Sequence, residues 1–128
     1  MLAGLVPLLV VLWGCDSREL PEEYRNMPLP GAQIHSSEAL ATGKDLFYVH
    51  CSPCHGERAD GKGTIHRQLS SRPVDFTDSE WREEVSPQWV FYAIREGRKH
   101  TAMAGFDNRL SDEACWNLTG YVLSVGAR

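Results

Sequence analysis

The pentad Cys51-Ser52-Pro53-Cys54-His55 is the most informative stretch of this chain. A Cys-x-x-Cys-His sequence is the signature for covalent attachment of a c-type haem. Two thiols three positions apart can each bond one vinyl group, and the histidine that follows is then held as an axial ligand of the iron. We therefore predict one covalently attached haem c, bound through Cys51 and Cys54, with His55 as a metal ligand.

Other uses of a Cys-x-x-Cys pair explain the sequence less well. A structural zinc site needs four ligands, and Cys15 and Cys115 are isolated, without a second pair. A thioredoxin-like dithiol is expected in a βαβ unit, whereas this motif follows a helix-like stretch, residues 38–50. A lipoprotein without haem would leave the pentad without a function. The haem interpretation is favoured over all three.

Residues 1–15 form an uncharged apolar run that ends in Leu12-Trp13-Gly14-Cys15. The run is shorter than the roughly 20 residues that a membrane-spanning helix needs, but it fits the apolar region of a signal peptide. Its end resembles the bacterial lipobox, in which the cysteine is lipidated, with Trp13 where a small residue is usual. We predict a signal peptide over 1–15 and a lipid at Cys15 that holds the protein on the periplasmic side of the membrane. Secretion as a soluble periplasmic protein is the alternative.

Residues 16–37 are predicted to form a Pro-containing tether rather than part of the core. Prolines and a glycine stand there among charged residues: Pro21, Pro28, Pro30 and Gly31. Extended in polyproline geometry, the segment would reach roughly 65 Å, at about 3.1 Å per residue. Four apolar side chains leave a second interpretation open, an ordered segment along a partner subunit: Tyr24, Met27, Leu29 and Ile34.

Residues 38–128 are predicted to form one helical domain. The first helix runs from Glu38 to His50, the second starts after Ser86 and stops at Gly97, and the third begins after Ser111. Residues 56–80 are predicted to be irregular, and Cys115 to be a packed apolar side chain of the last helix. So small a domain buries little surface unaided, so the haem should supply much of its core.

The order of these motifs resembles class I c-type cytochromes of the bacterial monohaem branch. The matching segments cover nearly all of the domain: Gly43 and Phe47, the pentad, and residues 72–78, 93–97, 101–106, 110–113 and 121–122. The resemblance implies an all-α fold in which helices wrap around one covalently attached haem. It also implies that the first and last helices cross, at Gly43, Phe47 and Tyr121.

Met103 is the predicted second axial ligand of the iron. Met1 lies in the leader and Met27 in the tether, whereas Met103 stands in a loop of small residues between two helices. A thioether ligand favours ferrous iron and raises the reduction potential. His100 and His66 are the competing ligands, and a methionine that fills a gap in the core is the remaining alternative.

Two further residues are candidate haem-site groups. A ligating histidine usually donates its second ring N–H to a carbonyl or carboxylate, and the resemblance assigns that acceptor to the carbonyl of Pro73, with a rigid turn as the alternative. Arg72 is a candidate partner for a haem propionate because a guanidinium binds a carboxylate with two parallel hydrogen bonds. A solvent-facing charge is the alternative for Arg72. The basic run Arg95, Arg98 and Lys99 is either a docking surface for an acidic redox partner or a solvated face.

These features predict a monohaem cytochrome that transfers single electrons between membrane or periplasmic redox partners. It would act as a tethered carrier or as a subunit of a respiratory or dehydrogenase complex. We expect neither catalysis of its own nor a small-molecule substrate, and the net charge of −4 gives no reason to expect a nucleic-acid partner. The alternative is a haem-based ligand-binding sensor or peroxidase-like domain with a labile sixth ligand. Only His100 could serve as an acid or base near Met103, which argues against that alternative.

Overall fold

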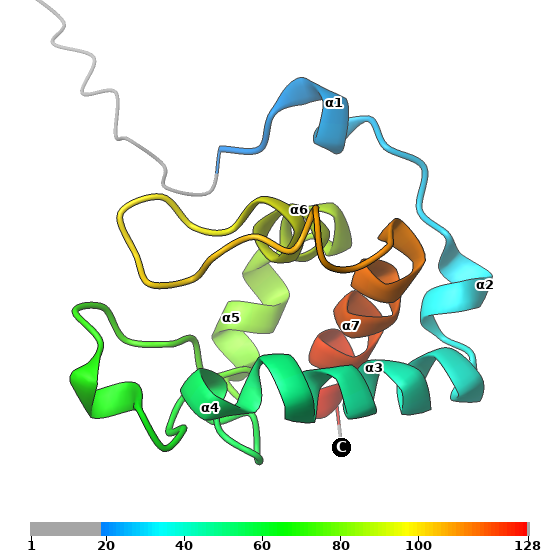
Figure 1. Cartoon of the computed structure of the whole chain (residues 1–128). Helices are drawn as coiled ribbons and strands as arrows, with labels where there is room; N and C mark the ends of the chain where they lie inside the picture. The colour runs from blue at the N-terminus through cyan, green and yellow to red at the C-terminus, as the bar shows by residue number, and fades with distance from the viewer. Residues whose placement is uncertain (1–18, 128) are drawn as a thin grey trace, which may run out of the picture.

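The structure is a computed structural model that describes residues 19–127, so the predicted leader and Cys15 lie outside it. The described residues form seven α-helices and one short 3-10 helix, arranged as in Figure 1: α1 (Glu22–Arg25), α2 (Gly31–Ile34), α3 (Ser37–His50), α4 (Ser52–His55), η1 (His66–Gln68), α5 (Ser79–Glu84), α6 (Pro87–Glu96) and α7 (Asp112–Val125). The described residues contain no β-strand, only an isolated bridge between Gly97 and Ala104. None of these helices is long and apolar enough to cross a membrane.

Serine side chains cap the three helices that the sequence predicts. The Ser36 hydroxyl accepts a hydrogen bond from the Ala39 N–H at 3.1 Å at the start of α3. Ser86 and Ser111 cap α6 and α7 in the same way. Each cap satisfies an N–H group that has no partner inside the helix. The three predicted helices are confirmed, with ends that differ by a residue or two.

The centre of the fold is the crossing of α3 and α7. A Cβ atom at Gly43 would lie only 2.1 Å from the backbone oxygen of Asn117, so the two helices approach too closely for any larger residue. One turn further along α3, the buried ring of Phe47 contacts the ring of Tyr121, with centroids 5.2 Å apart. The crossing that the resemblance implies is confirmed, and so is the small all-α architecture.

The third long helix, α6, packs beside α7 and completes the core. The ring of Phe91 stacks on the ring of Trp116, with centroids 4.2 Å apart and an interplanar angle of 16°. Cys115 is fully buried in the same layer, as predicted. Burial, more than the nearby Asp112 carboxylate, raises the pKa of its thiol to about 11, so the thiol is protonated at neutral pH.

The segment before α3 is not a free tether. Leu20, Tyr24 and Ile34 are buried in the core, and α1 lies on α6 while α2 lies on α7 (Figure 1). We call residues 20–36 the N-terminal strap. The prediction of a tether is therefore wrong for these residues. The surface on which they pack is formed by α6 and α7 of the same chain. Burial of a large apolar side chain contributes about 1.5–3 kcal/mol, and the prolines limit the backbone entropy that ordering the strap costs.

The stretch between the haem motif and α6 is mostly irregular, as predicted, but it contains η1 and ends in α5. The Asp78 carboxylate caps α5 by accepting a hydrogen bond from the Glu80 N–H at 2.9 Å. A helix of six residues is too short to produce a recognisable periodic pattern, which explains why the sequence did not predict it.

Candidate haem site

The pentad stands where α3 ends and α4 begins. The Cys51 N–H donates to the Phe47 carbonyl at 2.9 Å, and the His55 N–H donates to the Cys51 carbonyl at 2.9 Å. This hydrogen bonding places two cysteines and one histidine within a single helical turn. Cys51 and Cys54 are both half-buried free thiols, not joined to each other. Two free thiols beside an imidazole are the donor set that covalent haem attachment requires.

The His55 ring is fixed on two sides. Its Nδ1 lies 3.1 Å from the Val74 carbonyl oxygen, and its plane stacks on the buried ring of Phe76, with centroids 4.6 Å apart and an interplanar angle of 22°. Burial lowers the pKa of His55, and the hydrogen bond to Val74 opposes this effect only in part. The imidazole is therefore neutral near pH 7. When Nδ1 donates its proton to Val74, Nε2 is left with a lone pair for a metal.

The acceptor of the His55 hydrogen bond differs from the prediction by one residue. We predicted the carbonyl of Pro73, but the ring nitrogen contacts the carbonyl of Val74. The Pro73 oxygen faces Gly61 instead, where a Cβ atom would lie 2.8 Å from it. The side chain of Arg72, next in the chain, is exposed, and its pairing with a propionate stays a prediction.

The wider ligand set is consistent with haem rather than zinc. Burial raises the pKa of the Cys51 thiol to about 12, with the neighbouring Cys54 as a smaller cause, so this thiol is protonated at neutral pH. In residues 19–127 no three His, Cys, Asp or Glu side chains gather in a group that could hold a metal ion. A structural zinc ion therefore has no ligand set in this range.

Met103 lies in the loop between α6 and α7. We call residues 97–106 the Met103 loop. Met103 is half-buried; its carbonyl accepts a hydrogen bond from the Arg98 N–H at 3.0 Å, and its own N–H donates to the Thr101 hydroxyl at 3.2 Å. At the end of the loop, the buried Phe106 ring meets the His50 ring edge-on at 5.5 Å. The loop therefore ends beside the last turn of α3, directly before Cys51.

The competing histidines are placed less favourably. His100 is exposed and has a positive φ of 62°. The His66 ring is tied to its own turn, with Nδ1 2.6 Å from the Gly63 carbonyl oxygen. Ligation by Met103 stays a prediction, and nothing in the surroundings of either histidine favours it as the second ligand.

The predicted basic run does not form one uniform positive surface. Arg95 pairs with two carboxylates, Glu96 at 2.9 Å and Asp112 at 3.0 Å. The Arg98 guanidinium lies 4.6 Å above the Trp89 ring, and only Lys99 extends into solvent as an exposed cation. The charge available to attract an acidic partner is therefore smaller than the sequence indicates.

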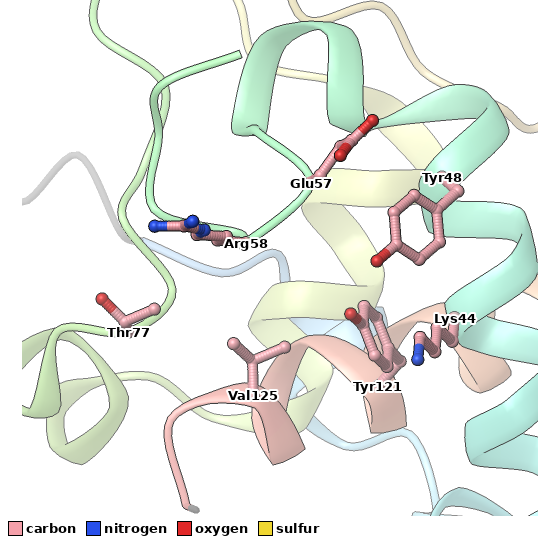
Figure 2. A pocket seen from close by; sticks show the side chains of 7 residues that line it. All are labelled: Lys44, Tyr48, Glu57, Arg58, Thr77, Tyr121 and Val125. Atoms are coloured by element: carbon pink, nitrogen blue, oxygen red, sulfur yellow. The ribbon is translucent and has the colours of Figure 1, made fainter.

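A surface pocket of about 260 Å³ lies between α3, the last turns of α7 and the loops that carry Arg58 and Thr77 (Figure 2). Its lining combines tyrosine and threonine hydroxyls with charged groups: Lys44, Tyr48, Glu57, Arg58, Thr77, Tyr121 and Val125. Figure 2 shows Tyr48 of α3 and Tyr121 of α7 on one side and Arg58 with Thr77 on the other. None of the predicted haem-site residues lines this pocket, so it is separate from the haem site.

Sequence reasoning did not assign roles to Val74, Phe76 and Tyr24. Phe76 stands in the same short segment as Pro73, and an aromatic residue there could have been proposed as a support for the histidine. Tyr24 had only the weak signal of an aromatic residue in a Pro-containing stretch. The choice of Val74 over Pro73 depends on the direction of single carbonyl groups, which no sequence pattern reports.

Comparisons with known proteins show the family of this domain. The family described as "Cytochrome C oxidase, cbb3-type, subunit III" matches residues 38–122. The chain is similar to the cbb3-type cytochrome c oxidase subunit FixP of Rhizobium etli, with 30% identity over 86 residues, which are 67% of this chain and 28% of that protein. The chain thus spans less than a third of this curated relative's length.

Two solved structures share the fold. One is a chain of the Kuenenia stuttgartiensis reducing HAO-like protein complex, with 26% identity and a TM-score of 0.64, covering 81% of this chain and 54% of that one. The other is the KustC0563 c-type cytochrome, with 28% identity and a TM-score of 0.57, covering 65% of this chain and 95% of that one. The cofactor of this family of domains is haem c. The chain belongs to the family of c-type cytochrome domains described as cytochrome c oxidase, cbb3-type, subunit III.

Proposed function

We propose that this domain carries single electrons on one haem attached through Cys51 and Cys54, with His55 and Met103 as axial ligands. The observation that carries the proposal is the setting of His55, whose neutral ring is fixed by Phe76 and Val74 beside two free thiols. When bound, the haem supplies a one-electron couple between ferric and ferrous iron. A ligand held on both sides keeps its position in both oxidation states, which suits electron transfer.

Met103 as the second ligand is supported by its place in the fold. Its loop ends against His50, next to the haem motif, and its side chain is half-buried rather than packed in the core. Met27 is committed elsewhere, because it packs against the core from the N-terminal strap. We also propose that Arg72, exposed beside the His55 support, pairs with a propionate.

Absorption spectra of the purified haem-loaded protein test the ligand set. We expect a low-spin spectrum with the near-infrared sulfur-to-iron band in the ferric form, and only slight carbon monoxide binding by the ferrous form. A high-spin spectrum or rapid carbon monoxide binding would instead support a ligand-binding or peroxidase-like domain. Absence of haem after expression with a cytochrome c maturation system would refute the attachment itself.

We further propose that the protein is lipid-anchored at Cys15 and works as a subunit of a membrane-bound redox complex. Leu20, where the N-terminal strap begins to pack, stands only five residues after Cys15. At about 3.3–3.6 Å per residue that link spans at most roughly 18 Å, so the lipid would hold the domain close to the membrane. A domain held so closely favours partners in the same membrane over distant ones. FixP, to which the chain is similar, is itself named as an oxidase subunit.

Two measurements separate the anchor from the complex. Mass spectrometry of the membrane fraction should find an acylated Cys15, and Cys15→Ser should release the haem-loaded protein into the periplasmic fraction. Native electrophoresis of mildly solubilised membranes should show the haem migrating with larger subunits. Migration as a free monomer, with the anchor intact, would mean a tethered carrier instead of a fixed subunit.

A further inference from the structure

One buried tyrosine of the N-terminal strap joins a charged network at the end of α6. The Tyr24 side chain is only 4% exposed, and its hydroxyl donates a hydrogen bond to the Glu96 carboxylate. The same hydroxyl accepts a hydrogen bond from Arg95 Nη1 at 2.9 Å, and Arg95 Nε donates to Asp112 at 3.0 Å. The strap, α6 and α7 are thus joined at a single point.

The position of the Tyr24 ring is set by aromatic contacts on α6. Its ring meets the Tyr92 ring edge-on, with centroids 4.8 Å apart, and lies 6.3 Å from the Phe91 ring. Burial and the hydrogen bond to Glu96 raise the pKa of Tyr24, so the hydroxyl is protonated at neutral pH and remains a donor. The strap therefore presents a fixed hydroxyl group to Arg95 and Glu96.

The backbone of the same part of α6 holds the base of the Met103 loop. The Arg95 carbonyl accepts hydrogen bonds from the N–H groups of Phe106 at 2.9 Å and Asp107 at 3.1 Å. Gly105 lies so close that a Cβ atom there would be 2.5 Å from the Arg95 oxygen. A change in the position of Arg95 is therefore transmitted directly to the end of the loop that carries Met103.

We propose that Tyr24 is a positioning residue for the Met103 loop, holding the loop's base through Arg95 and Glu96 so that the Met103 sulfur stays available to the iron. The proposal rests on Met103 being the sixth ligand. The Tyr24 hydroxyl bonds to Glu96 and Arg95 rather than to the pentad or Met103, so it acts through the residues between. Without the hydroxyl, Arg95 and Glu96 lose a partly buried partner and the base of the loop gains freedom.

The test compares two hydroxyl deletions in the haem-loaded full chain, Tyr24→Phe and Tyr48→Phe. Tyr48 is an exposed tyrosine of α3 outside the network, so its variant controls for the loss of one oxygen atom. The measurement is carbon monoxide binding by the ferrous protein, together with the temperature at which the near-infrared band of the ferric protein disappears. Couplings between sites commonly amount to about 5- to 150-fold.

We expect Tyr24→Phe to raise the fraction of ferrous protein open to carbon monoxide about fivefold, the low end of that range, and to lower the temperature at which the band is lost. Tyr48→Phe should behave as the wild type, and both variants should keep normal haem content and far-ultraviolet circular dichroism. If the wild type shows the near-infrared band but the two variants have the same carbon monoxide binding and lose the band at the same temperature, the inference about Tyr24 is overturned.

A wild type that lacks the band would instead refute Met103 ligation, so the two failures are distinguishable. If Tyr24→Phe does not fold, Glu96→Ala decides the matter, because it keeps the aromatic packing of the strap and removes the group that accepts the hydrogen bond from the Tyr24 hydroxyl. It should also raise carbon monoxide binding, and an unchanged value would contradict the proposal.

Discussion

The two ligand positions of the proposed haem site are held in different ways. His55 is fixed within the core by the Phe76 ring and the Val74 carbonyl, next to the α3–α7 crossing. Met103 stands in a loop held mainly at its base, and the residues just before it, 99–102, are exposed. One ligand is therefore built into the fold, and the other depends on how firmly a loop is positioned. Substitutions on the His55 side should lower both the haem content and the stability of the domain, whereas substitutions on the Met103 side should change mainly the ligation of the iron.

The largest expected effect is that of His55→Ala. The substitution removes the proposed proximal ligand together with the ring that stacks on Phe76. Mutation of a residue that only hydrogen-bonds a metal ligand commonly lowers metal affinity or activity about 10- to 100-fold. Loss of the ligand itself should be at least as severe, so we expect the haem content to fall by at least about tenfold. Haem content per protein, measured as the pyridine haemochrome, checks this. His35→Ala, on an exposed residue, should have normal content, and a normal content in His55→Ala would disprove the rigid proximal site.

Phe76→Ala should follow, because it leaves His55 in place but removes its support. Phe76 is 8% exposed and also contacts the rings of Phe47 and Trp81. Truncation of a buried phenylalanine lowers the free energy of unfolding by about 3–5 kcal/mol. Denaturant unfolding of the haem-loaded protein measures the loss, and Phe76→Leu should lose less. Leu29→Ala, at an exposed apolar residue, should stay within about 0.5 kcal/mol of the wild type.

Met103→Ala should leave a folded protein with its haem attached but change the iron's ligation. The near-infrared band should disappear, and the ferrous protein should bind carbon monoxide. Because the side chain is half-buried, the free energy of unfolding should fall by about 2 kcal/mol or less, below the loss in Phe76→Ala. Met27→Ala serves as the matched control and should keep the band. A band that persists in Met103→Ala would exclude Met103 as the ligand and make His100→Ala the next variant to measure.

The same contrast explains which parts of the molecule the sequence predicted. The α3–α7 crossing and the pentad depend on short-range patterns, since Gly43 and Phe47 share one helical face and Cys51, Cys54 and His55 share one turn. Helix propensity and caps act over the same short range, so the three long helices followed from the sequence.

The N-terminal strap could not be predicted in this way. Tyr24 meets its partner Glu96 from 72 positions away, and the strap's two helices have four residues each. No periodic pattern develops over so few residues, and the prolines and charges of the segment are typical of a linker. The packing of Leu20, Tyr24 and Ile34 on α6 and α7 exists only in the folded molecule. For this reason the part of the chain that we infer positions Met103 is also the part that the sequence placed wrongly.

Asp112→Asn has the smallest expected effect. It changes the exposed end of the hydrogen-bond network that joins Tyr24, Glu96, Arg95 and Asp112. The Asp112 side chain is 66% exposed, and exposed ion pairs contribute only about 0–1 kcal/mol. The amide oxygen of an asparagine can still accept the hydrogen bond from Arg95, so carbon monoxide binding should not change. Glu113→Gln, in the same helical turn, controls for the interaction of a negative charge with the start of α7.

The free energy of unfolding should differ between these two variants by less than about 1 kcal/mol, and added salt should reduce the difference further. A clear rise in carbon monoxide binding in Asp112→Asn alone would contradict this. It would mean that the Asp112 carboxylate, rather than the Tyr24 hydroxyl, holds the base of the Met103 loop through Arg95. The position of Met103 would then depend on α7 instead of on the N-terminal strap.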